Sequence, residues 1–485
     1  MEVKEQFTSR WGLLLAAIGM AIGAGNIWRF PRVVAQNGGS AFLIPWVIFL
    51  FLWSIPLLIA EFAIGKHTRR GTIGSFAKIM GEKYAWMGAF VGFVTIGIMF
   101  YYSVVSGWSL SYFIQAVSGK LAAKADQQVY WHQFTSSYWP LLYHFVAISM
   151  AGYVIYKGVV AGIERVAKIF IPLLLILMLI AAVRALFLPN AVAGLNYLFY
   201  PNVEKLLDFR VWLEALSQSA WSTGAGWGLI LTYAVYMKQK EDINLNAFIT
   251  GFGNNSASLI VAIAIIPTVF SLLSQPDALA AMDSGNTGLT FIWIPQLFDE
   301  MPLGRLFSSV FFLTLFIAAI SSLIAMVELA ARILMDFGLN RKKAVLYVWL
   351  SSLLFGIPSA LSLGFFNNQD WTWGVGLLVS GFFFAIAVNK YGAENFRNKL
   401  VNSSPNDIRV GRWYSFLLRF VIPIEFVVLI SWWFYQAITT YEPHSWWNPF
   451  STYSMGTCLF QWGIAMILFM LFNKKIVANI KLEEV

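Results

Sequence analysis

Apolar runs close to the length of a membrane crossing recur along the whole chain and limit its possible folds more than any other feature. A helix needs about 20 such residues to cross the hydrocarbon core. Backbone groups in lipid must bond internally, and the short alternating segments of a barrel are absent, so we predict helices. The sequence therefore predicts an all-α, polytopic membrane protein of about twelve transmembrane helices. Clear examples of the runs are Phe42–Ala60, Phe170–Leu188, Leu259–Leu273, Val310–Val327 and Met455–Phe472.

The charged residues also fit a membrane protein. Hydrophobic residues make up 59% of the chain and charged residues only 12%, which leaves too little polar side chain to cover a water-exposed surface. The basic residues behind the net charge of +9 gather in alternate connections between apolar runs. This positive-inside pattern predicts that both termini are cytoplasmic. We therefore expect a multi-pass protein of a cytoplasmic membrane, inner or plasma, with the lipid bilayer and not nucleic acid as its partner.

Residues with catalytic or metal-binding potential are sparse. Cys458 is the single cysteine, which excludes a disulfide within one chain and a cysteine-based metal cluster. The four histidines show no ligand spacing. No nucleophile and acid–base pair converge near the membrane, so we predict that the chain is not an enzyme. No small-residue cleavage site follows the first apolar run, so the start, Met1–Arg10, is interpreted as a cytoplasmic tail.

No linker or low-complexity segment divides the chain, and we predict one transmembrane domain over residues 1–485. Helices 1 to 5 form a first repeat of about 10–187, helices 6 to 10 a second of about 211–390, and helices 11 and 12 cover about 413–472. The predicted helices span residues 10–36, 40–66, 84–119, 138–156, 164–187, 211–238, 243–272, 303–337, 343–361, 370–390, 413–438 and 451–472.

Two helices break their own pattern, and they break it alike. Helix 1 contains Gly23–Asn26 and helix 6 contains Gly224–Gly228, each about halfway through the membrane. Glycines inside a helix cost roughly 1 kcal/mol each relative to alanine. One such pair could be a packing notch between helices. Breaks at corresponding depth in the first helix of each five-helix group instead favour a 5+5 inverted repeat with discontinuous helices, whose free backbone groups can hold a zwitterion and a cation.

The residues around these breaks closely resemble the signature of the neurotransmitter:sodium symporter family. The resemblance spans helices 1 to 10 and implies sodium-coupled symport of an amino acid by alternating access. The matching residues are Arg10, Gly12, Ala21–Pro31, Asn37–Phe42, Pro45, Pro56, Glu61, Gly162–Arg165 and Ala318–Ser322.

The resemblance implies two sodium sites. The first has the carbonyl of Ala21 with the side chains of Asn26, Ser222 and Asn254, where Asn254 is preferred to its neighbour Asn255. An interhelical hydrogen bond is the alternative role for such asparagines. The second joins helices 1 and 8, and its hydroxyl groups could instead bond back to their own helix. Its ligands would be the carbonyls of Gly19, Ile22 and Ala318 and the hydroxyls of Ser321 and Ser322.

The same resemblance implies a substrate site between the breaks. The substrate carboxylate would meet the first sodium ion, the N–H groups near Ala24 and Gly25, and the Tyr102 hydroxyl. The ammonium group would meet carbonyls at Ala21, Trp221, Ser222 and Gly224. Monoamine carriers hold an aspartate where this chain has Gly23, so a substrate with its own carboxylate is expected.

Substrate size follows from the side chains expected around that site. Ile98, Trp221, Trp227 and Met326 are larger than their counterparts in leucine carriers, and Ser322 shares a helix face with Met326. Gly224 favours a larger substrate, because the absence of a side chain on the unwound segment leaves more space in the site. We favour glycine, alanine or a similarly small neutral amino acid, with bulky hydrophobic or aromatic amino acids as the runner-up.

The resemblance also implies gates and a test for chloride. Arg29 and Asp370 would close the outer side above Trp221 and Tyr102. Lys4, Tyr236 and Asp336 would close the cytoplasmic side, and Lys4 stands where relatives have arginine, whose bidentate geometry lysine lacks. The residues available for chloride are Gln218, Ser222 and Ser258. Trp46 replaces the usual tyrosine and offers only an indole N–H, so we predict weak or absent chloride dependence.

Other functional classes remain open from the sequence. A channel would not need paired breaks, whereas a non-transporting amino-acid receptor on the same fold would keep them. Uptake into proteoliposomes separates a receptor from a carrier. The sequence contains no feature that sets the oligomeric state.

Overall fold

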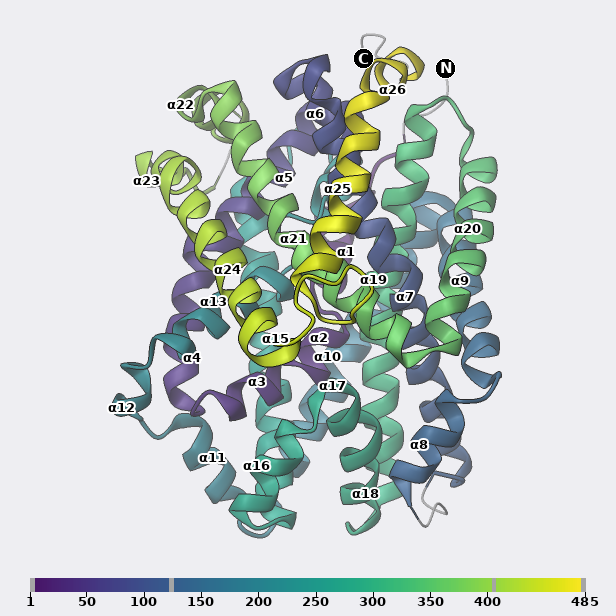
Figure 1. Ribbon diagram of the computed structural model, residues 1–485, viewed down its shortest axis with the longest axis vertical. Helices are drawn as coiled ribbons and strands as arrows, with labels where there is room; N and C mark the ends of the chain where they lie inside the picture. Colours follow the sequence, from purple (N-terminus) through teal and green to yellow (C-terminus); the bar gives the residue numbers. More distant parts are fainter. Residues whose placement is uncertain (1–4, 122–125, 404–406, 481–485) are drawn as a thin grey trace.

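The computed structural model describes residues 5–121, 126–403 and 407–480, and within these ranges all regular structure is helical. The helices run roughly along one direction (Figure 1). The start of α1 and the short helix α26 lie at the same end of the molecule, which we call the terminal side. The shorter helices α8, α11, α12, α16 and α18 gather at the opposite side.

Twelve membrane crossings account for the long helices. Nine are continuous spans in the described part of the chain, and two more come from bent pairs, α1 with α2–α3 at 53° and α25 with α26 at 61°. The interrupted pair α13 and α14 supplies the twelfth. In chain order the crossings are α1 to α3 (Arg10–Ala21, Ala24–Trp28, Phe30–Gln36), α4–η1–α5 (Ser40–Phe49, Leu50–Ser54, Ile55–Thr68), α7 (Ala85–Ser118), α9 (Trp139–Tyr156), η3–α10 (Val159–Glu164, Arg165–Leu186), α13 and α14 (Phe209–Ser222, Leu229–Ala234), α15 (Ile243–Leu272), α19 (Gly304–Asp336), α20 (Arg341–Leu361), α21 (Leu363–Tyr391), α23–η6–α24–η7 (Arg412–Phe416, Leu417–Val421, Ile422–Gln436, Ala437–Tyr441) and α25 (Met455–Leu471).

The shorter elements lie between the crossings, except for α26, which follows the last one. They are α6 (Thr72–Met80), η2 (Glu82–Tyr84), α8 (Gln127–Thr135), α11 (Ala191–Phe199), α12 (Val203–Leu206), α16 (Gln275–Asp283), α17 (Gly285–Gly288), η4 (Leu289–Trp293), α18 (Ile294–Asp299), α22 (Ala393–Phe396), η5 (Arg397–Val401) and α26 (Asn473–Asn479).

Burial separates inner crossings from outer ones. The most apolar window of α19 is 83% buried and that of α21 is 89% buried, whereas those of α10 and α24 are each 33% buried. A helix that is apolar all round and exposed in the protein must face lipid. The long helices α7 and α19 pack against each other in the middle of the bundle, and α1 packs against α10, α15 and α19. The interrupted helices therefore lie inside the bundle.

Most predicted spans lie within a few residues of the observed ones, and two predictions need correction. The tenth crossing begins at Leu363 and not near Asp370, because Ser362 caps it by accepting a hydrogen bond from the Phe365 N–H at 3.2 Å. The first crossing is interrupted at Ile22 and Gly23, and helix resumes at Ala24, so the break is shorter than Gly23–Asn26.

Candidate functional site

The break between α1 and α2 is held by side chains from two other crossings. Gly23 is extended, with φ −101° and ψ −174°, and its N–H donates to Asn26 Oδ1 at 3.0 Å. The Ala24 N–H donates to the Tyr102 hydroxyl of α7 at 2.9 Å. A Cβ added to Gly23 would lie 3.0 Å from both the Tyr102 hydroxyl and Ser322 Oγ of α19. The missing side chain thus lets α7 and α19 approach the exposed backbone.

The break between α13 and α14 depends on glycine geometry and on one buried carboxylate. Gly224, Gly226 and Gly228 have φ of 69°, 87° and 79°, in the left-handed region that favours glycine. Glu61 of α5 is fully buried, and it accepts the Gly226 N–H at 2.6 Å and the Leu231 N–H at 3.0 Å. A carboxylate at the start of α14 satisfies backbone donors that the break leaves without helical partners.

Four of the residues predicted for a first sodium site meet at the two breaks. One terminal atom of the Asn254 amide lies 2.8 Å from Asn26 Nδ2, 3.0 Å from the Ala21 carbonyl oxygen and 3.2 Å from the Ser222 carbonyl oxygen. The other terminal atom lies 3.0 Å from Ser222 Oγ and 3.1 Å from Asn255 Oδ1. When its oxygen faces Ala21 and Ser222, three oxygens converge with no proton between them. A hard cation stabilises such a donor set, so these three oxygens fit sodium. Asn26 instead turns its Nδ2 toward them and bonds its Oδ1 to the Gly23 N–H.

The residues predicted for a second sodium site lie where α1 packs on α19. Ser322 Oγ donates to the Met20 carbonyl at 3.0 Å, which joins the two helices. A Cβ on Gly19 would lie 3.7 Å from the Ser321 Cβ, so this pair is also close. Ile22 and Ala318 are fully buried. Ser321 Oγ donates to Ile317 of its own helix at 2.7 Å, which is the alternative role for this hydroxyl.

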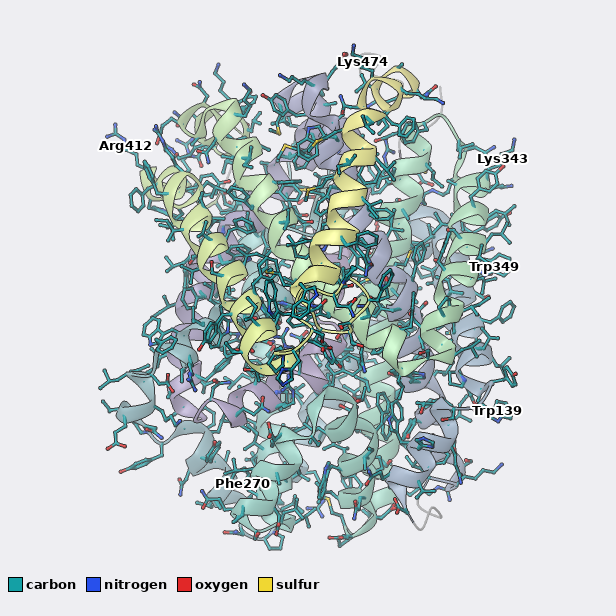
Figure 2. All side chains as sticks on the ribbon, in the orientation of Figure 1. Trp139, Phe270, Lys343, Trp349, Arg412 and Lys474 are labelled. Atoms are coloured by element: carbon teal, nitrogen blue, oxygen red, sulfur yellow. The ribbon has the colours of Figure 1, made fainter. Side chains whose placement is uncertain are left out.

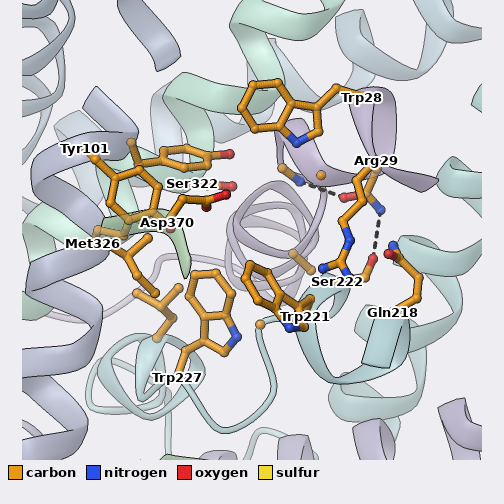
Figure 3. Close-up of a pocket in the computed structure, with 18 of the residues that line it drawn as sticks. Trp28, Arg29, Tyr101, Gln218, Trp221, Ser222, Trp227, Ser322, Met326 and Asp370 are labelled. Carbon is orange, nitrogen blue, oxygen red and sulfur yellow. Dashed lines mark hydrogen bonds between the residues drawn. The ribbon is translucent and has the colours of Figure 1, made fainter. Parts of the chain in front are cut away.

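A cavity of about 180 Å³ opens between the breaks (Figure 3). Nearly all of the residues predicted for the substrate line it, and Ala24 is the exception because it contributes only its backbone N–H to the Tyr102 contact. The predicted residues that line it are Ala21, Gly23, Gly25, Ile98, Tyr102, Trp221, Ser222, Gly224, Trp227, Ser322 and Met326.

Several lining residues were not predicted. Met20 precedes the α1 break, and Tyr101 and Trp371 are sequence neighbours of the predicted Tyr102 and Asp370. Trp433 lies in α24, and Tyr453 lies in the connection that precedes α25. Adjacency in sequence could have suggested Tyr101 and Trp371. The C-terminal aromatics carry no signal, because they resemble any aromatic residue near a membrane surface.

The cavity extends past Arg29 and Asp370 toward the side opposite the termini. The Arg29 guanidinium carbon lies 4.6 Å from the centre of the Trp221 ring, and Figure 3 shows the two side chains together. Asp370 stands beside the Tyr101 hydroxyl. Among the described residues, no ion pair within 4.0 Å joins Arg29 to Asp370. The predicted outer pair therefore faces a common cavity without being closed.

The terminal side is closed by a charged network that the sequence did not reveal. Arg341 pairs with Glu328 at 2.6 Å and with Glu5 at 2.6 Å, and it donates to the Tyr236 hydroxyl at 3.2 Å. The Tyr236 hydroxyl also donates to Glu328, which is fully buried. The Phe7 N–H donates to the Tyr236 carbonyl at 3.2 Å and holds the start of the chain against this network.

Of the residues predicted for this side, Tyr236 belongs to the network, and Asp336 is linked to it through Arg332, which bonds to both Asp336 and Tyr236. Asp336 pairs with Arg332 at 2.9 Å and accepts the Gly71 N–H at 2.7 Å. Lys4 lies outside the described residues. A second cavity of about 740 Å³ lies beside Tyr236, Arg332 and Arg341, and it shares no described lining residue with the first.

The residues predicted for chloride lie next to the first cluster. Asn26 Nδ2 donates to Ser258 Oγ at 2.7 Å, so this hydroxyl is engaged. Gln218 Oε1 and Trp46 Nε1 are buried with no hydrogen-bond partner in the described part of the chain. Gln218 also lines the cavity.

Comparison with known proteins gives concordant results. The model of the sodium:neurotransmitter symporter family matches residues 4–138 and 131–480. An uncharacterized sodium-dependent transporter of Methanocaldococcus jannaschii is 31% identical over 88% of this chain and 90% of its own. The bovine sodium- and chloride-dependent taurine transporter is 25% identical over 96% and 82%. The crystal structure of MhsT in complex with L-phenylalanine matches with a TM-score of 0.77 and 31% identity, over 88% of this chain and 99% of MhsT.

Proposed function

This chain belongs to the sodium:neurotransmitter symporter family and is a sodium-dependent symporter, and from that premise we propose that it carries a small neutral amino acid, glycine or alanine. The observation that carries the proposal is the size of the cavity between the two helix breaks. Its volume of about 180 Å³ includes the extension past Arg29 and Asp370 and is below the roughly 300–1,000 Å³ of common ligand sites. Ile98, Trp221 and Trp227 are among the side chains that bound this volume.

We assign the ends of the substrate to the two breaks. The carboxylate is expected near the first sodium ion, the Gly25 backbone and the Tyr102 hydroxyl. The ammonium group is expected at the carbonyls near Ser222 and Gly224. A glycine at position 23 supports this polarity, because the first break then carries no acidic side chain of its own that would repel a carboxylate.

Sodium is a cargo of the transport cycle, and two sites are proposed for it. The converging oxygens at Ala21, Ser222 and Asn254 support the first, which would share its ion with the substrate carboxylate. The contact of Ser322 with Met20 supports the second, between α1 and α19. Since the second ion would touch two helices and no substrate, it can favour the conformation in which those helices are packed together.

The alternating-access cycle requires one closed side and one accessible side. We propose that both termini face the cytoplasm, as the basic connections indicate. The network of Glu5, Tyr236, Glu328 and Arg341 then forms the cytoplasmic gate in this conformation. Arg29 and Asp370 form the outer gate and are expected to approach each other once substrate and sodium are bound.

Bulky hydrophobic or aromatic amino acids are the second candidate. MhsT, whose structure holds L-phenylalanine, supports it. Gly224 supports it too, because the atom nearest to an added Cβ is Met20 Sδ at 2.8 Å, on a flexible side chain that can move aside. The bulk of Trp221 and Trp227 argues against this candidate, because both side chains occupy the wall of the cavity.

Chloride coupling is proposed to be weak or absent. Ser258 is already bonded to Asn26, and Trp46 supplies an indole N–H where a hydroxyl would be expected. Replacement of chloride by gluconate should leave sodium-driven uptake largely unchanged. A collapse of uptake in gluconate would show that this assignment is wrong.

The substrate is tested by sodium-gradient-driven uptake in proteoliposomes, with unlabelled amino acids as competitors. A misfitting methylene costs on the order of 1–3 kcal/mol, so alanine should outcompete leucine by tenfold or more. Trp227→Phe should narrow this gap by enlarging the cavity, whereas Trp11→Phe, on a side chain that is 70% exposed, should not.

Each other outcome of this assay has a defined meaning. Leucine or tryptophan displacing label better than glycine and alanine would favour the second candidate. Binding of an amino acid without uptake of any of the twenty would instead indicate a receptor that has kept the fold.

A further inference from the structure

A groove of about 520 Å³ runs along the lipid-facing surface where α9 packs beside α20. It lies at the terminal end of both helices, since α9 ends at Tyr156 and α20 begins at Arg341. Figure 2 shows Lys343 at the terminal side of this edge of the molecule, with Trp349 and then Trp139 farther along it. With the termini in the cytoplasm, the groove faces the inner leaflet.

The mouth of the groove is cationic. Lys342 and Lys343 line it, and Lys157 lies just past the end of α9. Lys342 Nζ lies 5.7 Å from the centre of the Tyr156 ring, and Lys157 Nζ lies 5.2 Å from that of Tyr153. None of the three lysines has an ion-pair partner among the residues that the structure describes. Their charges are therefore available to an anion at the membrane surface.

Below the mouth the groove becomes apolar. Leu346 and Trp349 follow Lys342 by one and two helical turns on the same face, so Trp349 lies roughly 10 Å deeper. The indole N–H of Trp349 donates to Ser149 Oγ of α9 at 3.0 Å, which fixes the ring as a wall. Gly152 forms the floor, and a Cβ added there would meet only the Trp349 ring, at 3.5 Å.

We propose that this groove binds one anionic phospholipid of the cytoplasmic leaflet. The phosphate group lies between Lys342 and Lys343, and an acyl chain lies along Trp349 over Gly152. Cationic pockets between helices on this side of a membrane are suited to such headgroups. Lysines that only extend to the surface would need neither a fixed indole nor an open floor beneath them. The combination of free charge and apolar depth matches the two parts of a lipid molecule.

The position of the groove connects the lipid with the cytoplasmic gate. Arg341 directly precedes the two lysines, and its guanidinium donates to the Ile155 carbonyl of α9 at 3.4 Å. The same side chain holds Glu5 and Glu328. A lipid that links the ends of α9 and α20 would therefore stabilise the two helices around Arg341.

The proposal is tested by native mass spectrometry of the purified full-length chain, titrated with phosphatidylglycerol or phosphatidylcholine. One phosphatidylglycerol should stay bound when phosphatidylcholine has dissociated. Each surface lysine contributes about a fivefold gain in affinity for an anionic lipid, so Lys342→Gln with Lys343→Gln should weaken binding roughly 30-fold. The matched control is Lys474→Gln with Lys475→Gln on α26, which removes the same charge from two exposed lysines and should change nothing.

A second variant separates the groove from its charges. Gly152→Leu fills the floor without altering any lysine and should also lose the bound lipid. If the unaltered chain bound phosphatidylglycerol and phosphatidylcholine equally, the proposal would be overturned by that result alone. Unchanged phosphatidylglycerol binding in Lys342→Gln with Lys343→Gln, or in Gly152→Leu, would overturn it as well. The proposal would also be overturned if the unaltered chain formed a dimer that Gly152→Leu abolished, because a second copy of the chain would then occupy the groove.

Discussion

At the scale of single residues, Asn26 connects the first helix break to α15. Its Oδ1 accepts the Gly23 N–H, and its Nδ2 lies within hydrogen-bonding distance of Asn254 of α15 and of Ser258. One side chain therefore fixes the backbone of the first break and the position of the amide that would hold sodium. Asn255 is next in sequence to Asn254 and its Nδ2 has no partner in the described chain, so the two asparagines are not equivalent.

Asn26→Asp should change the affinities for sodium and substrate together. Coupling between sites is reciprocal, and a typical coupling of 1–3 kcal/mol corresponds to about 5- to 150-fold. We expect substrate affinity to fall at least fivefold at a fixed sodium concentration, because a carboxylate would face the substrate carboxylate. Equilibrium binding of substrate at several sodium concentrations measures both affinities. Asn255→Asp is the control and should change them less. Lower sodium affinity with unaltered substrate affinity at every sodium concentration would remove Asn26 from a shared site.

The serines of α19 allow a second test. Ser321→Ala with Ser322→Ala should weaken sodium binding and favour inward-facing conformations, since an ion shifts a population only through its differential affinity. A reporter cysteine at Met335, which lines the terminal cavity, should become more reactive at a given sodium concentration. Cys458 is buried and should stay silent. Ser308→Ala with Ser309→Ala, at the other end of α19, is the control. The assignment fails if the sodium dependence of labelling stays the same.

At the scale of elements, the break in the sixth crossing is the feature that the sequence located best. A helix cannot continue through Gly224, Gly226 and Gly228, and all three have positive φ in the structure. The first break was located less well. The predicted break extended to Asn26, whereas Ala24–Trp28 is helical and Asn26 bonds back to the Gly23 N–H. That return depends on contacts with Tyr102 and Ser322 from distant parts of the chain, which local composition does not encode.

Other elements were missed for a different physical reason. The short helices on the side opposite the termini, such as α16 and α18, are too short and too polar to stand out from connecting segments. The network around Arg341 joins four segments by one residue each, Glu5, Tyr236, Glu328 and Arg341. The sequence predicted Tyr236 by resemblance, whereas each of the three charged members alone looks like a surface charge. The resemblance to the family, in contrast, identified most of the residues that line the cavity.

Gly226→Ala should destabilise the protein more than any exposed glycine replacement. A left-handed φ costs about 1–2 kcal/mol for a residue with a Cβ, and the added atom would lie 2.6 Å from the Gly381 Cα. Overpacking of this kind costs about 1–3 kcal/mol more. Thermal unfolding in detergent should show a Tm several degrees lower. Gly463→Ala in α25 is the control, because nothing lies within 4 Å of its added Cβ and alanine favours helix. An equal decrease of Tm in both variants would contradict the explanation.

At the scale of the whole molecule, closure of the terminal side depends on a buried ion pair. Glu328 is fully buried, and it pairs with Arg341, which also holds Glu5 at the start of the chain. Removing one partner of a buried pair leaves an uncompensated charge at a cost of about 3–5 kcal/mol. The closed arrangement is therefore sensitive to one side chain more than to the many apolar contacts around it.

Arg341→Gln should open the terminal side. The amides of residues 5–10 should exchange hydrogen at least tenfold faster, because the Phe7 N–H is bonded to Tyr236, a member of the same network. Mass spectrometry of exchanged peptides measures this, and peptides of α10 report any global loss of stability. Arg397→Gln breaks a pair with the exposed Glu394 and should leave the segment protected. Equal protection in both variants would show that Arg341 does not close this side.

The separation of the two cavities has an electrical consequence. They lie toward opposite sides and share no described lining residue, so a layer of protein separates them. The membrane voltage is then expected to fall mainly across that layer, where moving one elementary charge through 100 mV corresponds to about 2.3 kcal/mol. Ion entry into the first cavity would cross little of the field. When the loaded protein reorients, this layer would move past the bound sodium, so most of the charge would cross the field in that step. Voltage should therefore change the rate of reorientation more than the affinity for sodium.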